Sequence, residues 1–455
     1  MSYPRYPTMR NSGVEWLGEV PHEWQQRRMR FVCEINPSKA ELSLLPEDTT
    51  VSFVAMEKVG TDGQLLLDTT RLLESVLQGF TYFKDGDVIV AKITPCFENG
   101  KGAFCNELVN GIGFGSTEFH VLRPYRDYAP QFIYYVTYSY PFRSIGAALM
   151  QGSAGQKRVP DEFVKDFTIA WPPLAEQRRV AAFLDAKTVE LDTLVALKER
   201  QVALLLLQRQ ALISHAVTKG LDPNAPMADS GVEWLGEVPA GWEITRVKFL
   251  ARSIQTGPFG SQLYATDYVE GGTPVINPSN IQNSRIVPDY QISVDVDTIT
   301  RLSRHVLMKG DIVCARRGEL GRCGLVTKRE QGWLCGTGSL RVRPNTSKSF
   351  PAYLGSFLSL SSVKEWLVVE SVGSTMNNLN TDILANLPIM CPPLSEQRAI
   401  VAYLDRETSQ IDTLVATIRA QIERLRVYRQ ALISAAVTGK IDVREIKLGA
   451  EAEES

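Results

Sequence analysis

The sequence predicts an α+β protein with a pseudo-twofold repeat: two mixed α/β domains separated by two long antiparallel helices that form an intramolecular coiled coil. The first observation behind this prediction is an internal repeat. NSGVEWLGEVPHEW at 11–24 returns as DSGVEWLGEVPAGW at 229–242, and the segment 172–218 returns as 392–438. The second observation is that the stretches between these repeated segments share little sequence. A framework duplicated around two unlike inserts predicts a molecule with an approximate twofold axis.

The repeat divides the chain into seven segments. In order they are an N-terminal repeat box (1–23), a first variable segment (24–170), a central helix (171–218), a linker with the second repeat box (219–241), a second variable segment (242–390), a C-terminal helix (391–440) and an acidic tail (441–455). We expect the acidic tail to be disordered. We keep the names first and second variable segment throughout.

Two long helices are predicted, over 174–218 and 394–438. Neither stretch contains Gly or Pro, apolar residues recur every three or four positions, and each helix follows a Pro-Pro pair and ends near Gly220 or Gly439. At about 1.5 Å per residue each helix would extend roughly 60 Å. A narrow apolar stripe of that length needs a partner helix, and the only equally long helix is the other copy. Twofold symmetry would make the two helices antiparallel, with the variable segments at opposite ends.

The variable segments are predicted to contain both strands and helices, and to share one fold. GDVIVAK at 86–92 and GDIVCAR at 310–316 are β-branched runs after a Gly-Asp turn, and FHVLRP and LRVRP, which end at Pro124 and Pro344, resemble matching later strands. An amphipathic helix follows in each segment, around 131–150 and 351–369.

Composition favours a soluble, cytoplasmic protein of three to four modules. The chain has 455 residues, of which 44% are hydrophobic. A chain of this length is too long for one core. No apolar run approaches the roughly 20 residues that cross a bilayer, and the N-terminus lacks the apolar region of a signal peptide. The seven cysteines contain no C-x-x-C pair and only four histidines accompany them, so we expect no metal site but reduced, mostly buried thiols.

Charge is distributed unevenly along the chain. The formal net charge is only −2. The second variable segment, however, carries 16 Lys and Arg against 12 Asp and Glu, whereas the first carries 15 against 17. Binding to nucleic acid depends on where charges lie rather than on their total. The second segment is therefore the more basic candidate surface.

The repeated motifs resemble those of a known family. The GVEWLGEVP box, the PPL-x-EQ start of each long helix, RQALIS near each helix end, and the duplication of the whole arrangement are similar to the specificity subunit of Type I restriction-modification enzymes. The resemblance covers nearly the whole chain. It implies two target recognition domains that read a bipartite, gapped double-stranded DNA target, with the helices setting the gap.

The resemblance also implies partners and cofactors. A specificity subunit is non-catalytic and holds methyltransferase subunits, expected to be two, and beyond them restriction subunits. No cofactor is expected on this chain, while S-adenosylmethionine, ATP and Mg are expected on the partner subunits. The residues agree, because the chain lacks an Asn/Asp-Pro-Pro-aromatic loop, a P-loop and a nuclease-type carboxylate cluster.

Candidate DNA contacts come from strand ends and polar loops. Long cations after equivalent strands can reach phosphates or guanine edges, and amide or cationic side chains in loops suit base and phosphate contacts. The alternatives are a solvated strand end and a capping role. The candidates are Lys92, Lys101, Gln156, Lys157, Arg158, Arg316, Arg317, Arg322, Asn377 and Asn378.

Candidate docking residues come from the repeated parts, which must do the same task twice. They either dock each variable segment on the helices or bind a partner subunit; for the Glu residues, capping of the helix is a further alternative. These candidates are Trp16, Leu17, Trp234, Leu235, Glu176, Gln177, Glu396 and Gln397. His120, His215 and His305 have no partner in the sequence and are interpreted as structural.

A function of a different class remains open. Twin domains on a duplicated frame are also compatible with a protein-protein scaffold that does not bind DNA. Salt-dependent binding to duplex DNA distinguishes the two hypotheses, since phosphate contacts make affinity fall steeply with salt.

Overall fold

The computed structural model describes residues 3–153, 155–282, 284–371 and 379–447. The chain forms two compact units, Met1–Glu199 with Arg419–Ser455, and Arg200–Ile418. We call them unit 1 and unit 2. Each unit contains one variable segment together with a portion of each long helix.

The two long helices are α5 (Leu174–Lys219) and α11 (Leu394–Val437). Both follow a Pro-Pro pair, as predicted. Beyond their C-terminal ends, Gly220 and Gly439 have φ values of 77° and 72°. Glycine adopts this left-handed conformation without the steric penalty that a Cβ brings, and it commonly terminates a helix. Both predicted helices are confirmed.

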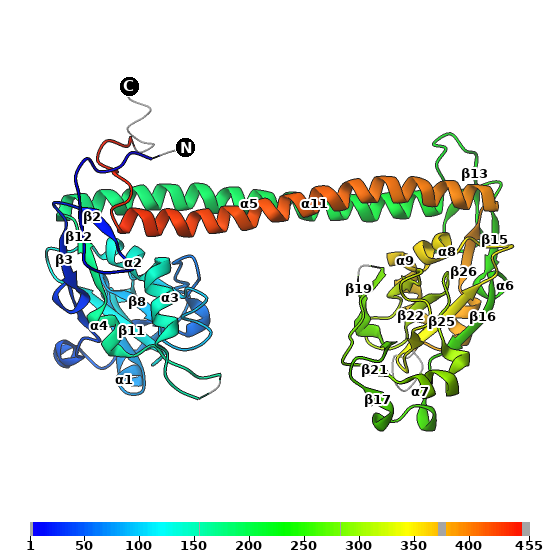
Figure 1. Ribbon diagram of the computed structural model, residues 1–455, viewed down its shortest axis with the longest axis horizontal. Coiled ribbons are helices and arrows are strands. Elements are labelled where there is room, and N and C mark those ends of the chain that lie inside the picture. Colours follow the sequence, from blue (N-terminus) through cyan, green and yellow to red (C-terminus); the bar gives the residue numbers. More distant parts are fainter. Residues whose placement is uncertain (1–2, 154, 283, 372–378, 448–455) are drawn as a thin grey trace. The chain divides into compact units, whose positions relative to one another are not determined.

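The helices run antiparallel within each unit (Figure 1). In unit 1, Arg429 Nε lies 2.9 Å from Asp192 Oδ1, and Lys198 Nζ donates to Gln421 Oε1 at 2.7 Å. The partner residue number falls as the number along α5 rises, which defines an antiparallel pair. In unit 2, Arg209 lies 2.9 Å from Asp412.

The first variable segment contains two four-stranded sheets. The sheet that carries the candidate residues has the order β4 (Cys33–Ile35), β11 (Phe119–Pro124), β8 (Val88–Ala91) and β9 (Gly102–Phe104), all antiparallel. The second sheet has the order β6 (Thr70–Leu72), β5 (Thr50–Val54), β10 (Ile112–Gly115) and β7 (Thr81–Lys84), with β5 and β10 parallel. A separate pair joins β3 (Gln25–Arg28) to β12 (Thr168–Trp171).

The predicted helix around 131–150 is wrong as a single helix. It is two helices, α2 (Pro130–Tyr138) and α3 (Tyr140–Ala148). Ser139 between them has extended φ and ψ of −64° and 150°, and Pro141 occupies the first turn of α3, where its missing N–H costs nothing. Helix α2 packs against β8, β9 and β11, and Figure 1 shows it beside β8 and β11. Two short helices, α1 (Leu73–Val76) and α4 (Asp161–Asp166), complete the segment.

The second variable segment repeats this plan. Its main sheet has the order β16 (Ala251–Thr256), β25 (Ser339–Pro344), β22 (Ile312–Ala315) and β23 (Cys323–Leu325). The other pairings are β15 (Glu243–Arg246) with β26 (Pro388–Cys391), β19 (Ile281–Gln282) with β20 (Arg285–Ile286), and the order β17 (Tyr268–Val269), β21 (Ser293–Val294), β18 (Thr273–Ile276), β24 (Leu334–Cys335). The shared order of the main sheets supports one common fold, as predicted.

The helices of the second variable segment also correspond to those of the first. The predicted helix around 351–369 is again two helices, α8 (Pro351–Leu358) and α9 (Ser361–Ser371), so the single-helix prediction is wrong here too. The chain leaves the helix at Ser359, the C-cap of α8. Helices α6 (Val247–Leu250), α7 (Val296–Arg301) and α10 (Thr381–Asn386) are short. The buried residues Tyr353, Phe357 and Leu384 form part of the core.

The repeat boxes form two-stranded hairpins, β1 (Met9–Asn11) with β2 (Glu19–Pro21), and β13 (Met227–Asp229) with β14 (Glu237–Pro239).

The start of the acidic tail is ordered, whereas we expected the whole tail to be disordered. Ile441 and Val443 are buried in the core of unit 1, and the Asp442 N–H donates to the Pro4 carbonyl at 2.9 Å. Burial of these two apolar side chains stabilises the start of the tail. Residues 448–455 lie outside the described part of the chain.

The seven cysteines are free thiols, and five of them are buried, as predicted. Burial raises the pKa of the Cys33 and Cys105 thiols, because the thiolate is poorly solvated inside the protein. No helix among the described residues is both long and apolar enough to span a bilayer.

Candidate nucleic-acid interface

Three loops of the first variable segment meet where strand β8 ends. Lys92 directly follows β8, and its N–H donates to the Glu118 carbonyl at 2.8 Å, just before β11. The Lys92 carbonyl accepts from the Val159 N–H at 2.8 Å, just before α4. These backbone bonds bring Lys92, Glu118 and Arg158 together, and we call these three residues the first strand-end cluster.

The second variable segment contains the same arrangement. Arg316 follows β22, its N–H donates to the Gly338 carbonyl at 3.0 Å, and its carbonyl accepts from the Leu379 N–H at 2.9 Å. Arg316 therefore corresponds to Lys92, and Gly338 corresponds to Glu118. We call Arg316, Arg317 and Gly338 the second strand-end cluster. The two clusters have the same backbone hydrogen bonds but different side chains.

An ion pair occupies the first cluster. Arg158 Nε lies 2.9 Å from Glu118 Oε2, and Arg158 Nη2 lies 2.7 Å from Oε1 of the same carboxylate. The hydrogen bond from Arg158 lowers the pKa of Glu118, and the same bond raises the pKa of Arg158. Lys92 is half-buried, and its ammonium makes no side-chain hydrogen bond to the described residues. Lys92 is thus the cation of this cluster that forms no ion pair with the described residues.

The second cluster has no carboxylate at the corresponding position, because Gly338 has no side chain. Burial lowers the pKa of Arg316, and the neighbouring charge of Arg317 lowers it further. The Arg316 Nε is buried without a hydrogen-bond partner among the described residues. Arg317 is exposed. Two adjacent cations of this kind are stabilised by an anion such as a phosphate group.

Gln156 and Lys157 lie in an exposed loop beside the first cluster. The loop is closed by paired backbone bonds between Gln151 and Arg158, and the Lys157 carbonyl accepts from the Thr94 N–H at 2.9 Å. Their side chains make no hydrogen bond to the described residues and can reach a ligand. The candidates Asn377 and Asn378 lie outside the described residues.

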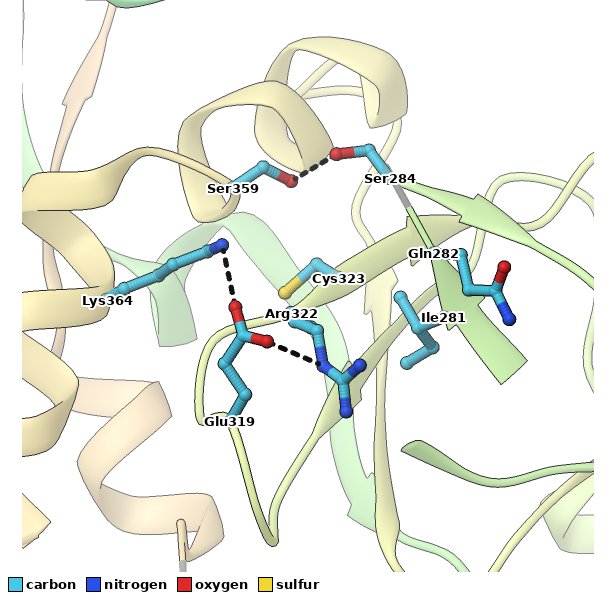
Figure 2. Close-up of a pocket in the computed structure, with 8 residues that line it drawn as sticks. All are labelled: Ile281, Gln282, Ser284, Glu319, Arg322, Cys323, Ser359 and Lys364. Carbon is cyan, nitrogen blue, oxygen red and sulfur yellow. Dashed lines mark hydrogen bonds and ion pairs between the residues drawn. The ribbon is translucent and has the colours of Figure 1, made fainter. Parts of the chain in front are cut away.

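Lys101 and Arg322 are already engaged within their own segments. Lys101 Nζ donates to the Met56 carbonyl at 2.8 Å. Arg322 lines a pocket of about 320 Å³ with Lys364, and the Glu319 carboxylate lies between them, 3.6 Å from a nitrogen of each (Figure 2). A DNA contact by either residue would compete with these interactions.

Gln177 and Gln397 hold equivalent positions near the start of α5 and α11, and both are almost completely buried. Gln177 Oε1 accepts from the Ala129 N–H at 2.8 Å, and its Nε2 donates to the Pro172 carbonyl at 2.9 Å. Gln397 accepts from the Phe350 N–H at 2.7 Å and donates to the Pro392 carbonyl at 2.8 Å. Ala129 and Phe350 are the N-caps of α2 and α8. Each glutamine therefore links a long helix to its variable segment.

The glutamates beside these glutamines also face their own units. Glu176 Oε1 accepts from the Tyr6 hydroxyl at 2.6 Å and from Trp24 Nε1 at 3.2 Å. Burial, and then this hydrogen bond, raises the pKa of Tyr6. Glu396 Oε1 lies within 3.3 Å of the position that a Cβ would take on Gly220, so it faces the end of α5.

The Trp-Leu pairs of the repeat boxes pack inside their own units, each against different partners. Trp16 stacks on Phe167 with ring centroids 5.0 Å apart, while the Trp234 ring centroid lies 6.4 Å from those of Phe357 and Trp366. Leu17 and Leu235 are buried. Each Trp therefore contacts aromatic side chains of the variable segment in its own unit. A role in binding a partner subunit stays a prediction for the same residues.

Sequence reasoning missed a buried ion pair that occurs in both variable segments. Arg123 donates to Asp87 through Nε at 2.9 Å and Nη2 at 2.8 Å, and Arg343 donates to Asp311 at 2.8 and 2.7 Å. The signal was present in the sequence, since each Asp follows the Gly of a Gly-Asp turn and each Arg precedes the Pro that ends the later strand. The pair fixes two neighbouring strands of each main sheet.

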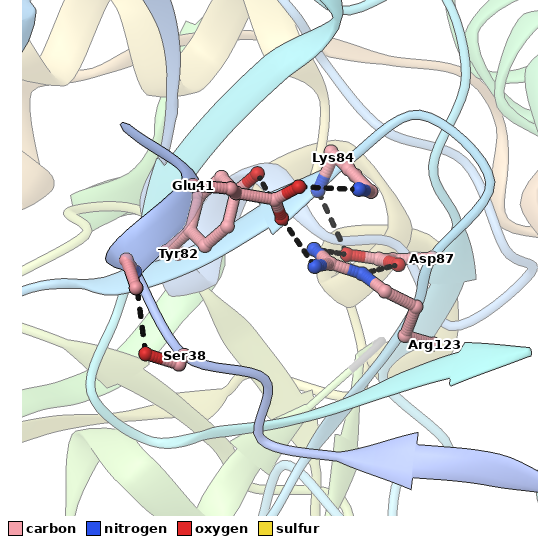
Figure 3. Close-up of polar contacts among 7 residues, drawn as sticks. Ser38, Glu41, Tyr82, Lys84, Asp87 and Arg123 are labelled. Atoms are coloured by element: carbon pink, nitrogen blue, oxygen red, sulfur yellow. Dashed lines mark hydrogen bonds and ion pairs between the residues drawn. The ribbon is translucent and has the colours of Figure 1, made fainter. Parts of the chain in front are cut away.

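In the first variable segment this pair extends into a network (Figure 3). Glu41 accepts from Arg123, from the Tyr82 hydroxyl at 2.9 Å and from Lys84 Nζ at 2.8 Å. The hydrogen bond from Lys84, with further help from Tyr82 and Arg123, lowers the pKa of Glu41 to about 2. Burial, and then Glu41, raises the pKa of Tyr82 to about 12.

Within residues 3–153, 155–282, 284–371 and 379–447, no three His, Cys, Asp or Glu side chains group as a metal site. His120 is buried, with Nε2 3.0 Å from the Val159 carbonyl, and burial lowers its pKa. His305 is buried with Nδ1 3.0 Å from the Thr256 carbonyl, and His215 is exposed on α5.

The family model of the Type I restriction modification DNA specificity domain matches the chain twice, at residues 21–201 and 239–424. Each match spans one variable segment and continues into one long helix, so together they cover well over half of the chain. The chain belongs to the Type I restriction-modification specificity family. The duplicated match agrees with the duplicated sheet order of the two variable segments.

Curated specificity subunits match over parts of the chain. The EcoAI specificity subunit of Escherichia coli is 39% identical over 165 residues, which are 36% of this chain and 27% of the relative. The EcoEI subunit, also from Escherichia coli, is 38% identical over 177 residues, or 38% of this chain and 29% of the relative. The chain thus matches less than a third of the length of these two relatives. The putative MjaX specificity subunit of Methanocaldococcus jannaschii is 22% identical over 94% of this chain and 96% of its own length.

Solved structures of specificity subunits share the fold. A chain from work on complex assembly and conformational transition of the type I R-M system aligns with a TM-score of 0.72 at 22% identity, over 93% of this chain and 99% of its own length. The HsdS subunit from Thermoanaerobacter tengcongensis aligns with a TM-score of 0.53 at 21% identity, over 93% and 98%. At this level of identity the likeness concerns the fold alone.

Proposed function

We propose that this specificity-family chain is the DNA sequence-recognition subunit of a Type I restriction-modification complex. It binds a bipartite, gapped duplex target, with one half-site for each variable segment, and directs methyltransferase and restriction subunits to that target. The observation that carries the proposal is the pair of strand-end clusters, which share backbone hydrogen bonds but differ in side chains. Equivalent backbone arrangements that carry different side chains suit two different half-sites on one duplex.

Contacts to phosphate provide much of the affinity. Arg316 and Arg317 in the second cluster, and Lys92 and Lys157 in the first segment, are cations without a carboxylate partner among the described residues. Such contacts release counterions, so the affinity for duplex DNA falls steeply as salt rises. Base contacts in each segment then select the sequence.

The chemistry belongs to partner subunits. In this proposal two methyltransferase subunits, and the restriction subunits beyond them, carry S-adenosylmethionine, ATP and Mg, while this chain carries no catalytic group and no cofactor and works in the cytoplasm. Leu204 and Leu207 on α5 and Val427 on α11 are more than half exposed. Exposed apolar side chains on these helices suit a surface that another subunit covers.

The test is co-expression with a Type I methyltransferase subunit from the same genome, purification of the complex, and mapping of adenine methylation across genomic DNA. Methylation confined to one gapped, asymmetric motif is the expected result. A stable complex that methylates without a motif, together with duplex binding that does not depend on salt, would instead favour a protein-protein scaffold. If no complex forms, the proposed assembly is wrong.

A further inference from the structure

The Arg158 guanidinium presents two edges with different occupants. A guanidinium carries five N–H groups in a fixed planar fork. The edge formed by Nε and Nη2 is used by Glu118, at 2.9 and 2.7 Å. The other edge, formed by Nη1 and the second N–H of Nη2, meets only one acceptor among the described residues, the Gln156 carbonyl, at a long 3.3 Å from Nη1. This edge can therefore offer two parallel donors to a ligand.

The backbone places Arg158 without help from its side chain. The Arg158 N–H donates to the Gln151 carbonyl at 2.8 Å, and the Gln151 N–H donates back at 2.9 Å. The adjacent Val159 N–H donates to the Lys92 carbonyl at 2.8 Å. The Arg158 side chain is 45% exposed and the Glu118 side chain 22% exposed. Glu118 therefore orients a side chain that is already held at its base and is accessible to a ligand, an arrangement that favours specific recognition.

We propose that Arg158 reads one guanine in the half-site bound by the first variable segment, and that Glu118 is a positioning residue that holds the guanidinium for this contact. In the major groove, guanine presents the acceptors O6 and N7 side by side, and two parallel N–H groups of an arginine match them. The inference rests on the proposed function and specifies one base of its target.

The comparison of the two strand-end clusters favours guanine over phosphate as the ligand. The Arg158–Glu118 pair has little net charge of its own to offer a phosphate, and the carboxylate repels it, so Lys92 is the phosphate-binding cation of the first cluster. Guanine acceptors are neutral and require orientation more than charge. In the second cluster Gly338 replaces Glu118, and Arg316 and Arg317 lie close together. Those two arginines suit phosphate, whereas the Arg158–Glu118 pair suits a base edge.

The test uses the intact complex with its methyltransferase subunits and maps the methylated motif for Arg158→Lys and Glu118→Gln. Lysine keeps the charge but loses the planar fork, so discrimination at one guanine of the first half-site should fall about ten- to a hundredfold. Glu118→Gln should relax the same position. It should also steepen the salt dependence of duplex binding, because Arg158 becomes free to contact phosphate. The second half-site should not change with either variant.

A matched control is Asp166→Asn, which breaks the exposed ion pairs with Arg28 and Arg30 in the same unit. This variant should keep the wild-type motif. A purely structural role for Glu118 would lower stability without relaxing any base of the motif, and that result would overturn its assignment as a positioning residue.

A modified DNA tests the contact without changing the protein. Replacing the guanine by 7-deazaguanine removes the N7 acceptor, so the affinity of the wild-type complex should fall about tenfold. The affinity of the Arg158→Lys complex should hardly change with the same replacement, because that variant has already lost the contact. The inference is overturned if the first half-site contains no guanine, if no 7-deazaguanine in it weakens binding, or if Arg158→Lys keeps the full motif. A wild-type complex that methylates without any motif would overturn the proposed function itself.

Discussion

Asp87 and Arg123 form a bidentate ion pair in which the Asp87 side chain is 1% exposed. The Asp87 carboxylate also accepts the Lys84 N–H at 2.8 Å, which closes the turn before β8. Asp311 repeats both contacts in the second variable segment, with Arg343 and with the Met308 N–H. One pair thus fixes a turn and two strands in each segment.

Asp87→Asn should strongly destabilise the first variable segment. Removing the charge of Asp87 breaks the buried bidentate pair and leaves Glu41 as the remaining carboxylate partner of Arg123. The loss should therefore lie near the lower end of the cost of breaking a buried pair, about 3 kcal/mol of unfolding free energy. Urea unfolding of the full chain measures the loss. Asp68→Asn, which breaks the exposed pair with Lys58, should leave the midpoint almost unchanged. Equal losses for the two variants would show that Asp87 does not anchor the segment.

Gln177→Leu should weaken the attachment of the first variable segment to α5. The substitution nearly preserves volume but leaves the Ala129 N–H and the Pro172 carbonyl without their amide partner. Each orphaned group costs about 1–3 kcal/mol. Hydrogen exchange at the Ala129 amide should accelerate, whereas the exposed Arg178→Ala on the same helix should have no such effect. Unchanged protection at Ala129 would contradict the role assigned to Gln177.

Acid should destabilise the first variable segment through Glu41. Its pKa in the folded protein is about 2, below the ordinary value of 4.5, so its ionised form stabilises the fold. That contribution is complete above about pH 4.5 and is lost as the pH falls towards 2. Thermal unfolding between pH 2 and 6 should therefore show a smaller acid-induced decrease for Glu41→Gln than for the wild type. The exposed Glu47→Gln serves as the control and should follow the wild type.

Exchange of residues 242–390 for the corresponding segment of another specificity subunit should change one half-site only. The second variable segment has its own main sheet and core, formed within unit 2. Mapping of methylated motifs for the parent and the exchanged chain would measure the effect. A change in both half-sites would show that the two segments do not read DNA independently.

Several features were predictable because they depend on local sequence. The Pro-Pro pairs, the absence of Gly and Pro over 174–218 and 394–438, and the final glycines predicted both long helices. The Gly-Asp turns predicted strands β8 and β22. The break within each predicted amphipathic helix was missed at Ser139 and Ser359, because a helical pattern continues across the break when both helices pack on the same core.

The candidate interface was predictable only in part. Lys92 and Arg316 end the matching sequences GDVIVAK and GDIVCAR, so the sequence identified them as equivalent positions. The sequence did not indicate that Lys101 donates to the Met56 carbonyl, which lies 45 residues earlier in the chain. Nor did it indicate that Arg158 pairs with the carboxylate of Glu118, 40 residues earlier. Contacts of this range depend on how the strands pair and on where the connecting loops meet.

The sequence by itself determined the duplicated frame, the two long helices and the family, because repeats, helix boundaries and periodic apolar residues are local features of the chain. Tertiary structure alone decided which charged side chains are free. Lys101, Arg343 and Arg158 are equally cationic in the sequence, but the first donates to a carbonyl, the second is paired with a buried carboxylate, and the third keeps one edge open. The physical reason is that the availability of a charge depends on its neighbours in space, and the folded sheets supply those neighbours from 32 to 45 residues away in the sequence.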